Sequence, residues 1–443
     1  MIKKILHIIY NERRENSWLV VEIIAASIML WVAFDPLFTL VRLDSIDDGY
    51  NLDGTYLVSF TSYQPYDNRY RRDNVETERS GESYFNLYNV VRNMPEVESY
   101  CLTGYNQYPG ANSLFISTPY FTESIDAYYD DHEKFMKLVK EKGLAFNTHE
   151  IYNIEGYDYF TTFRVKDAFT GEIFTPRKND TENNIYISEK LAELHYGGTS
   201  EAIGKKMYSR DICYTISGVF KDMQIMDYAD QGPIMIKRND GRPTEYRNIP
   251  IHIRLKKEVD QEAFEKRFKA EVMPLLKAGN VYCTGIESHK AKRERQNESR
   301  GVPGRITMYT SMALFSLFTI FLGMLSAFWT RTSSRKSEIG IMRSVGASKR
   351  TIIRQFITEA TLLMSIGFAV AMLFVLHHLH VNGYTNPMDI VIKPDPSTLG
   401  GPLHFTWVTA TTYIILLIIA IAGAAIPAWR ITRILPADAL KEE

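Results

Sequence analysis

The chain has 443 residues, of which 45% are apolar and 23% are charged, a composition that excludes a mostly disordered protein. Its 51 lysines and arginines nearly balance 52 aspartates and glutamates, so its charge gives no reason to expect a nucleic-acid partner. The apolar residues gather in four windows with few charges, and this clustering excludes a simple soluble enzyme.

The N-terminal end predicts attachment to a membrane. Residues 1–16 predict a short amphipathic helix on the cytoplasmic membrane face, because apolar residues recur at helical spacing beside lysines; an unstructured tail is the alternative. Residues 17–41 predict the first transmembrane helix, since about 20 mainly apolar residues cross a bilayer. This window is too long for a signal peptide and no small-residue cleavage site follows it, so we expect an uncleaved anchor.

Two acidic residues, Glu22 and Asp35, lie inside this first window. Intramembrane acids are costly and often functional, and pairing across a dimer is one role to consider for them. Glu22 lies only about 7 Å past Ser17 by helix rise, so reaching the lipid headgroups is the alternative. Asp35 precedes Pro36 near the outer end of the window, where the proline marks a candidate kink.

Residues 42–305 are long enough to fold as a separate domain, which we expect to be mixed α+β with two subdomains. Short β-branched and aromatic runs predict strands at residues 54–60, 96–101, 113–117, 185–188, 213–219 and 249–255. Helical periodicity predicts helices at residues 82–94, 189–195 and 260–276. The highly charged residues 290–305 predict a solvated stalk that leads to the second transmembrane helix.

All three cysteines, Cys101, Cys213 and Cys283, fall in this domain. An odd number cannot fully pair within one chain, so at most one disulfide is expected in an oxidising compartment. Cys213 opens an apolar strand, and we expect it simply to be buried. The chain has no CxxC pair and no Cys/His spacing of the kind that binds metal, so we assign no metal site.

Three further apolar windows, at residues 306–330, 360–377 and 405–428, predict the second, third and fourth transmembrane helices. Lysines and arginines gather in the N-terminal flank, in residues 331–359 and in the tail 429–443, whereas the loop 378–404 has one lysine. The positive-inside rule therefore places the three basic regions in the cytoplasm and the large domain and the loop outside it. The predicted fold is an α-helical membrane protein with four transmembrane helices and a large mixed α+β extracytoplasmic domain between the first two.

The sequence has no motif for nucleotide or covalent chemistry. Its nearest phosphate-loop lookalike, residues 198–206, is one residue too long, and Lys206 stands where Mg²⁺ needs a Ser or Thr. A nucleophile elbow and a zinc-protease motif are also missing from the sequence. We therefore expect a non-catalytic protein with no catalytic residue, cofactor or metal of its own.

Residues 331–359, between the second and third predicted transmembrane helices, are the most informative segment. Six apolar residues there could form one face of two helices that flank a turn at Gly346, Ala347 and Ser348: Ile339, Met342, Ile352, Ile353, Phe356 and Ile357. Ser348 is expected to cap the second helix. Such a helix–turn–helix could lie in the membrane interface or dock in a groove of a cytoplasmic partner; a membrane-surface loop without a partner is the plain alternative.

At this segment the chain resembles the MacB/FtsX-like family of ABC-transporter permeases. The residues that carry the resemblance are Glu338, Ile339, Gly340, Arg343, Gly346 and Ala347, followed by a basic helix with Lys349, Arg350, Phe356 and Glu359. The family's C-terminal pattern is matched by Pro427, Arg430, Pro436 and Leu440, although Leu435 stands where the family often has Asp. Short runs within residues 156–220 follow the order seen in MacB-like periplasmic domains.

The resemblance implies that residues 331–359 are a coupling segment that contacts a cytoplasmic ABC ATPase. It also implies a permease that works as a homo- or heterodimer in the bacterial inner membrane, with both termini cytoplasmic and the large domain periplasmic. With only 16 residues before the first predicted span, we expect the ATPase to be a separate subunit that binds the ATP.

The main hypothesis is a permease subunit that transmits ATP-driven motion to its periplasmic domain and so drives export of a peptide, drug or lipid-linked cargo. A periplasmic adaptor, an outer-membrane channel and membrane lipid are further expected partners. The alternative is an FtsX-like regulator that activates a cell-wall hydrolase, although this outer domain is larger than such regulators usually carry. A third hypothesis, an anchored binding domain that needs no ATPase, leaves residues 331–359 unexplained.

Overall fold

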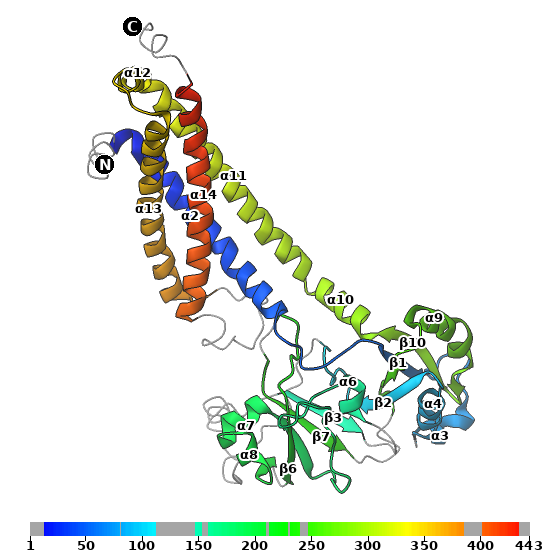
Figure 1. Ribbon diagram of the computed structural model, residues 1–443. Coiled ribbons are helices and arrows are strands. Elements are labelled where there is room, and N and C mark those ends of the chain that lie inside the picture. Colours follow the sequence, from blue (N-terminus) through cyan, green and yellow to red (C-terminus); the bar gives the residue numbers. More distant parts are fainter. Residues whose placement is uncertain are drawn as a thin grey trace. The chain divides into compact units, whose positions relative to one another are not determined.

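The computed structural model describes residues 13–79, 81–111, 147–152, 158–209, 212–228, 231–239, 247–384 and 401–433. The chain divides into two compact units (Figure 1). Met1–Arg42 and Gly301–Glu443 form the first, which we call the helical unit, and Leu43–Arg300 form the second, which we call the sheet unit. Most of the predicted N-terminal helix over residues 1–16 lies outside the described residues.

Four helices are long and apolar enough to cross a membrane: α2 (Arg13–Asp44), α11 (Val302–Ser334), α13 (Lys349–Asn382) and α14 (Pro402–Ile431). They contain the four apolar windows predicted from the sequence, so the four predicted helices are confirmed. Each helix extends beyond its window. The segment 331–359 is accordingly built from the end of α11, a short helix α12 (Lys336–Ser344) and the first turns of α13.

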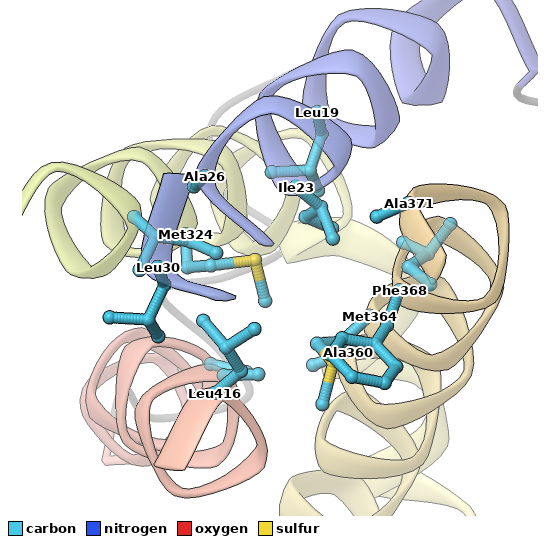
Figure 2. Packing of buried hydrophobic residues seen from close by; sticks show 14 of the residues in the cluster. Leu19, Ile23, Ala26, Leu30, Met324, Ala360, Met364, Phe368, Ala371 and Leu416 are labelled. Carbon is cyan, nitrogen blue, oxygen red and sulfur yellow. The ribbon is translucent and has the colours of Figure 1, made fainter. Parts of the chain in front are cut away.

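Apolar side chains from all four long helices meet in one core (Figure 2). Leu30 of α2, Met324 of α11 and Leu416 of α14 lie on one side of it, and Phe368 belongs to the α13 side. The helices approach closely where a glycine faces a neighbour: a Cβ on Gly423 of α14 would lie 2.8 Å from the Met324 Cβ. Such small-residue contacts supply the packing that holds helices together inside a membrane.

The sheet unit is built on one sheet, whose ten described strands run in the order β5-β6-β4-β7-β3-β2-β8-β1-β10-β9. Their bounds are β1 (Thr55–Ser62), β2 (Val97–Thr103), β3 (Asn147–Tyr152), β4 (Asn184–Ser188), β5 (Lys206–Ser209), β6 (Ile212–Phe220), β7 (Ile234–Asn239), β8 (Ile251–Leu255), β9 (Lys277–Ala278) and β10 (Val281–Ser288). Neighbouring strands are antiparallel except for the parallel pairs β3–β7 and β4–β6. The mixed α+β class is confirmed. One sheet runs through the unit, but its buried apolar residues form separate clusters, one around β1, β8 and β10 and two around β4, β6 and β7, so the two subdomains stay a prediction.

Short helices accompany the sheet: α3 (Val75–Arg79), α4 (Glu82–Arg92), α6 (Tyr159–Phe163), α7 (Glu189–Tyr196), α8 (Thr199–Ala202), α9 (Gln261–Arg267) and α10 (His289–Ser299). The predicted helices at residues 82–94 and 189–195 are confirmed to within a few residues. The one predicted at 260–276 is α9 followed by a π-helical turn and a 3₁₀ turn. The predicted strands are confirmed, except that residues 113–117 lie outside the described part.

The charged residues 290–305 lead to α11, as predicted, and all of them except Val302 are exposed or half-buried. They are most of α10, a short break and the first turn of α11. Arg293 of α10 pairs with Asp48 at 2.6 Å and with Asp227 at 2.5 Å, so this helix is tied to its own unit. Composition indicated a solvated segment, but it could not reveal carboxylates from distant parts of the chain.

The three cysteines are free thiols in this structure. Cys101 and Cys283 are buried, whereas Cys213 is only half-buried. The prediction that Cys213 is simply buried is therefore wrong. It occupies the second position of β6, where the strand pattern changes from exposed to buried.

Candidate coupling site

The predicted coupling segment folds as a helical hairpin that joins α12 to α13 (Figure 1). Gly346, after the end of α12, has a left-handed φ of +98°, a conformation that favours glycine. The Ala347 amide donates to the Met342 carbonyl at 2.9 Å, which satisfies a carbonyl at the end of α12. Ser348 then caps α13, because its Oγ accepts from the Thr351 amide at 3.2 Å. The predicted cap is thus confirmed.

One side of the hairpin is buried against the rest of the helical unit. Ile339, Gly340, Ile352 and Phe356 are all buried there. The predicted apolar face therefore packs largely on the protein itself. Helical periodicity identifies an apolar face but not what covers it, so docking of the hairpin at the membrane interface or on a partner stays a prediction.

The other side of the hairpin is open, and we call it the exposed turn face. It consists of Glu338, Ile341, Val345, Gly346, Lys349 and Arg350. Val345 is 83% exposed and Ile341 is 54% exposed. Two aliphatic side chains next to charged ones make a surface that suits docking in a partner's groove. Glu338, Gly346, Lys349 and Arg350 were all predicted as coupling residues, and Ala347 lies half-buried beside them.

Arg343, also predicted to contact an ATPase, makes an internal contact. Its Nη1 donates to the Thr432 carbonyl at 3.0 Å. Thr432 is the C-cap of α14, where a carbonyl lacks a partner within its own helix. The bond therefore ties α12 to the end of α14 and helps to set the direction of the exposed turn face.

Glu359 of α13, the last of the predicted coupling residues, is buried, with a side chain only 1% exposed. Its Oε1 accepts from Arg331 Nη1 at 2.5 Å, and its Oε2 accepts from Arg335 Nη1 at 3.2 Å. Arg331 lies in the last turn of α11 and Arg335 caps that helix. These three residues, which we call the Glu359 clamp, join α11 to α13. A buried carboxylate needs such partners, so the clamp fixes the two helices against each other.

Sequence reasoning misses the two arginines of the clamp, because it counts Arg331 and Arg335 only as charges that orient the membrane spans. Their spacing of four residues is a usable signal, since it places both on one helix face. The partner is harder to find. Glu359 is 28 residues from one arginine and 24 from the other, and no local pattern links them.

The predicted C-terminal motif is described only in part, because Pro436 and Leu440 lie outside the described residues. Pro427 is buried inside α14. The Arg430 guanidinium lies over the Trp329 ring of α11, 4.7 Å from its centroid, which is a cation–π distance. Both residues border a pocket of about 320 Å³ at the ends of α11 and α14.

The two predicted intramembrane acids both face other helices of the same chain. Asp35 is buried, and its Oδ1 lies 2.7 Å from His404 Nε2, which connects α2 to α14. Glu22 is half-buried on α2 and lies against Gly323 of α11, where a Cβ would come within 1.7 Å of the Glu22 Oε1. Glu22 also borders a groove of about 920 Å³ between α2 and α11. Asp35 thus has its partner within the chain, and a dimer role for Glu22 stays a prediction.

The hairpin combines one exposed side with one side that is fixed to the rest of the helical unit. Its outer side is free, its inner side is packed into the core, and polar contacts tie it to α11 and α14. Among the described residues, no group of three or more His, Cys, Asp or Glu side chains could hold a metal ion.

Comparison with known proteins finds similarity that includes this hairpin. Residues 310–436 match the family model described as FtsX-like permease C-terminal. The ABC transporter permease YvrN of Bacillus subtilis is 23% identical over 306 residues, which cover 66% of this chain and 70% of YvrN. The macrolide export ATP-binding/permease protein MacB of Neisseria gonorrhoeae is 30% identical over 310 residues, which cover 67% of this chain but only 44% of MacB.

Comparison with solved structures gives a further match. The crystal structure of the periplasmic region of MacB from Actinobacillus actinomycetemcomitans matches 58% of this chain and 98% of that one, with 10% identity and a TM-score of 0.30. The resemblance inferred from the motifs in residues 331–359 is confirmed by the sequence comparisons.

Proposed function

From its FtsX-like permease domain and its homology to MacB and YvrN, we propose that this membrane protein is the permease subunit of an ABC transporter. In this proposal a separate cytoplasmic ATPase binds the ATP and docks on the exposed turn face. The permease itself catalyses no reaction in this proposal. It passes the motion of the ATPase to the sheet unit on the other side of the membrane.

The observation that carries this proposal is the contrast between the two sides of the α12–α13 hairpin. Val345 and Ile341 are exposed at its tip, while Ile339 and Phe356 anchor its back in the core. A partner that binds at the tip would therefore displace the packed helices α12 and α13 rather than only a surface loop. Exposed aliphatic side chains beside Lys349 also give the mixed chemistry expected of a docking contact.

A path for the motion follows from the Glu359 clamp. A push on the hairpin moves the first turns of α13, and the clamp passes this displacement to Arg331 in the last turn of α11. α11 is one continuous helix of 33 residues, which spans about 50 Å at the usual rise per residue. Its first residue, Val302, follows the end of the sheet unit at Arg300 by two positions in the chain.

The proposal also includes an orientation in the membrane, a set of partners and a class of cargo. Both termini and the hairpin lie in the cytoplasm of a bacterial cell, the helical unit spans the inner membrane, and the sheet unit is periplasmic. The permease pairs with a second copy or with a related permease. The macrolide export named for MacB favours a drug, peptide or lipid-linked cargo in the periplasm, passed on through an adaptor and an outer-membrane channel.

The docking proposal is tested by Val345→Asp in tagged permease recovered from native membranes with a mild detergent. Putting a carboxylate into an apolar contact should lower the recovery of the ATPase by about tenfold or more. Val345 is 83% exposed, so the change leaves the fold intact. The control is Tyr66→Asp in the sheet unit, where Tyr66 is 87% exposed and recovery should not change.

Mass spectrometry of the same samples distinguishes the outcomes. Loss of an ABC ATPase with Val345→Asp and not with Tyr66→Asp supports the exposed turn face as its docking site. Equal ATPase recovery with both variants refutes that site. Co-recovery of a cell-wall hydrolase in place of an adaptor or outer-membrane channel would favour an FtsX-like regulator over an exporter.

A further inference from the structure

The geometry points to a binding pocket in the sheet unit for a small molecule that carries a carboxylate. This cavity has a volume of about 180 Å³, and we call it the Lys292 pocket. Its polar lining consists of Ser59, Tyr105, Asn106, Tyr108, Asn248 and Lys292. These residues come from β1, from the turn after β2, from the segment before β8 and from α10, so four separate segments converge on one small cavity.

Lys292 supplies the positive charge. Its ammonium group lies 5.2 Å from the centroid of the Tyr108 ring and makes no ion pair with any of the residues that the structure describes. Burial lowers the pKa of this amine, with the Glu287 carboxylate acting in the opposite direction. Among the described residues Lys292 has no ion-pair partner of its own, because the Glu287 carboxylate pairs with Arg295 at 2.7 Å, so a bound anion is stabilised at this half-buried lysine.

Tyr108 supplies an unused hydrogen-bond donor. The side chain is buried, and within the described chain its phenolic oxygen has no hydrogen-bond partner. The ring is held between Phe163, His252 and His289, with centroids 6.4, 4.8 and 5.0 Å away. Tyr108 lines the cavity and its hydroxyl is buried, and a buried polar group normally has a partner, so a ligand oxygen would supply the one that the described chain does not.

The asparagines of the pocket are held in an uncommon backbone conformation. Asn106 and Asn248 have φ values of +55° and +60°, and they are two of only four non-glycine residues with positive φ in the described chain. The Gln107 amide bonds to the Gly104 carbonyl at 3.0 Å and closes the turn around Asn106. Tyr84 donates to Asn248 Oδ1 at 2.6 Å, which leaves the amide nitrogen of that side chain as a donor. The wall is therefore preformed, and such backbone conformations gather at ligand sites.

The charge balance selects a carboxylate. The pocket offers one ammonium group together with neutral donors from a phenol, two amides and the Ser59 hydroxyl. One positive charge matches one carboxylate, whereas a phosphate carries close to two negative charges at neutral pH. Tyr105, 76% exposed at the rim, offers a ring surface for the remainder of the ligand. The volume fits a carboxylate with a few attached carbon atoms.

Amine labelling of the intact, detergent-purified chain tests this pocket. Lys292 is compared with Lys290, an exposed lysine on the same helix that pairs with Asp53. The probes are N-acetylalanine, acetate and inorganic phosphate, each matched in ionic strength with sodium chloride. We expect N-acetylalanine and acetate to slow the labelling of Lys292 several-fold and to leave that of Lys290 unchanged, as quantified by mass spectrometry.

Calorimetric titration of the same chain with N-acetylalanine gives a second readout. Lys292→Gln should abolish the binding, the control Lys290→Gln should leave it unchanged, and Tyr108→Phe should weaken it about tenfold, because it removes one hydrogen bond to a charged group and keeps the ring. Equal protection of Lys292 by chloride, protection by phosphate alone, or binding that survives Lys292→Gln would overturn the assignment. None of these results bears on the proposed docking of an ATPase at the α12–α13 hairpin.

Discussion

Removal of the carboxylate at Glu359 should destabilise the helical unit strongly. The Glu359 side chain is 1% exposed, and the two arginine side chains that it binds are 7% and 13% exposed, so Glu359→Leu removes the carboxylate that both buried arginines share. Breaking a buried ion pair by removing one partner costs about 3–5 kcal/mol. At roughly 2–4 °C per kcal/mol for a unit of this size, the expected fall in Tm is about 6–20 °C.

The assay is thermal unfolding of the detergent-purified chain, followed by a signal that reports on the helical unit, such as the fluorescence of its tryptophans. Glu338→Leu is the matched control, because it removes an acid that is exposed on α12. Its effect should stay within about 0.5 kcal/mol, as is usual for surface changes. Glu359→Gln keeps the shape and one acceptor oxygen, so its effect should fall between the two.

A combined variant separates the charge argument from simple packing. If Arg331, Arg335 and Glu359 are replaced together by Met, Met and Leu, no buried charge is left unpaired, and most of the lost stability should return. A Tm for Glu359→Leu equal to that of Glu338→Leu would refute the clamp. A combined variant no better than Glu359→Leu would show that packing, rather than charge pairing, sets the cost.

Three further predictions concern a close helix contact, a buried Asp–His pair and a buried histidine. Gly423→Ala should lower the free energy of unfolding by about 1–3 kcal/mol, because the added Cβ would press on α11. Gly304→Ala, which has open space around it on α11, should leave that free energy unchanged or raise it. Thermal unfolding of both variants checks this difference. Asp35→Leu and His404→Leu should each destabilise the helical unit by more than the double variant does, because only the single variants leave a buried polar group alone; a double-mutant cycle measures this coupling. Burial lowers the pKa of His289 to about 3, below its value of 6.5 in the unfolded chain. Between these two pH values a proton binds to the unfolded chain but not to the folded one, so stability falls as the pH drops from about 6.5 towards 3. That loss approaches roughly 1.4 kcal/mol per pH unit, and the pH dependence of sheet-unit unfolding should be flatter by this amount in His289→Gln than in the unchanged chain.

The apolar windows and the mixed domain between the first two were predictable because they depend on local sequence. Twenty-five uncharged residues at 306–330 can be read as a membrane-spanning helix without knowledge of any distant contact. The same holds for the cap at Ser348, whose partner Thr351 is three residues away. The single sheet was not predictable in this way, since strand β1 pairs with β8 and β10, almost 200 residues or more further along the chain.

The exposed and buried sides of the coupling hairpin show a second limit. Ile339 and Ile341 are two positions apart, and helical spacing places Ile339 on the predicted apolar face without saying whether that face meets a partner or the protein's own core. The fold makes the distinction, because Ile339 packs into the core while Ile341 is 54% exposed. A family motif combines residues that support the hairpin with residues that are free to touch another protein. Substitution of the supporting residues should change the stability of the fold. Substitution of the exposed residues should change the binding of a partner while the fold stays intact.

The clamp also explains how buried charges and membrane orientation are compatible. Two arginines and one carboxylate leave a net charge of about +1, so Arg331 and Arg335 still count as positive charge at the end of α11 after Glu359 has bound them. A one-to-one pair would cancel that signal, and an arginine cluster without the acid would repel itself inside the protein. The three-residue arrangement therefore joins α11 to α13 and retains one positive charge at the end of α11, as the predicted orientation requires.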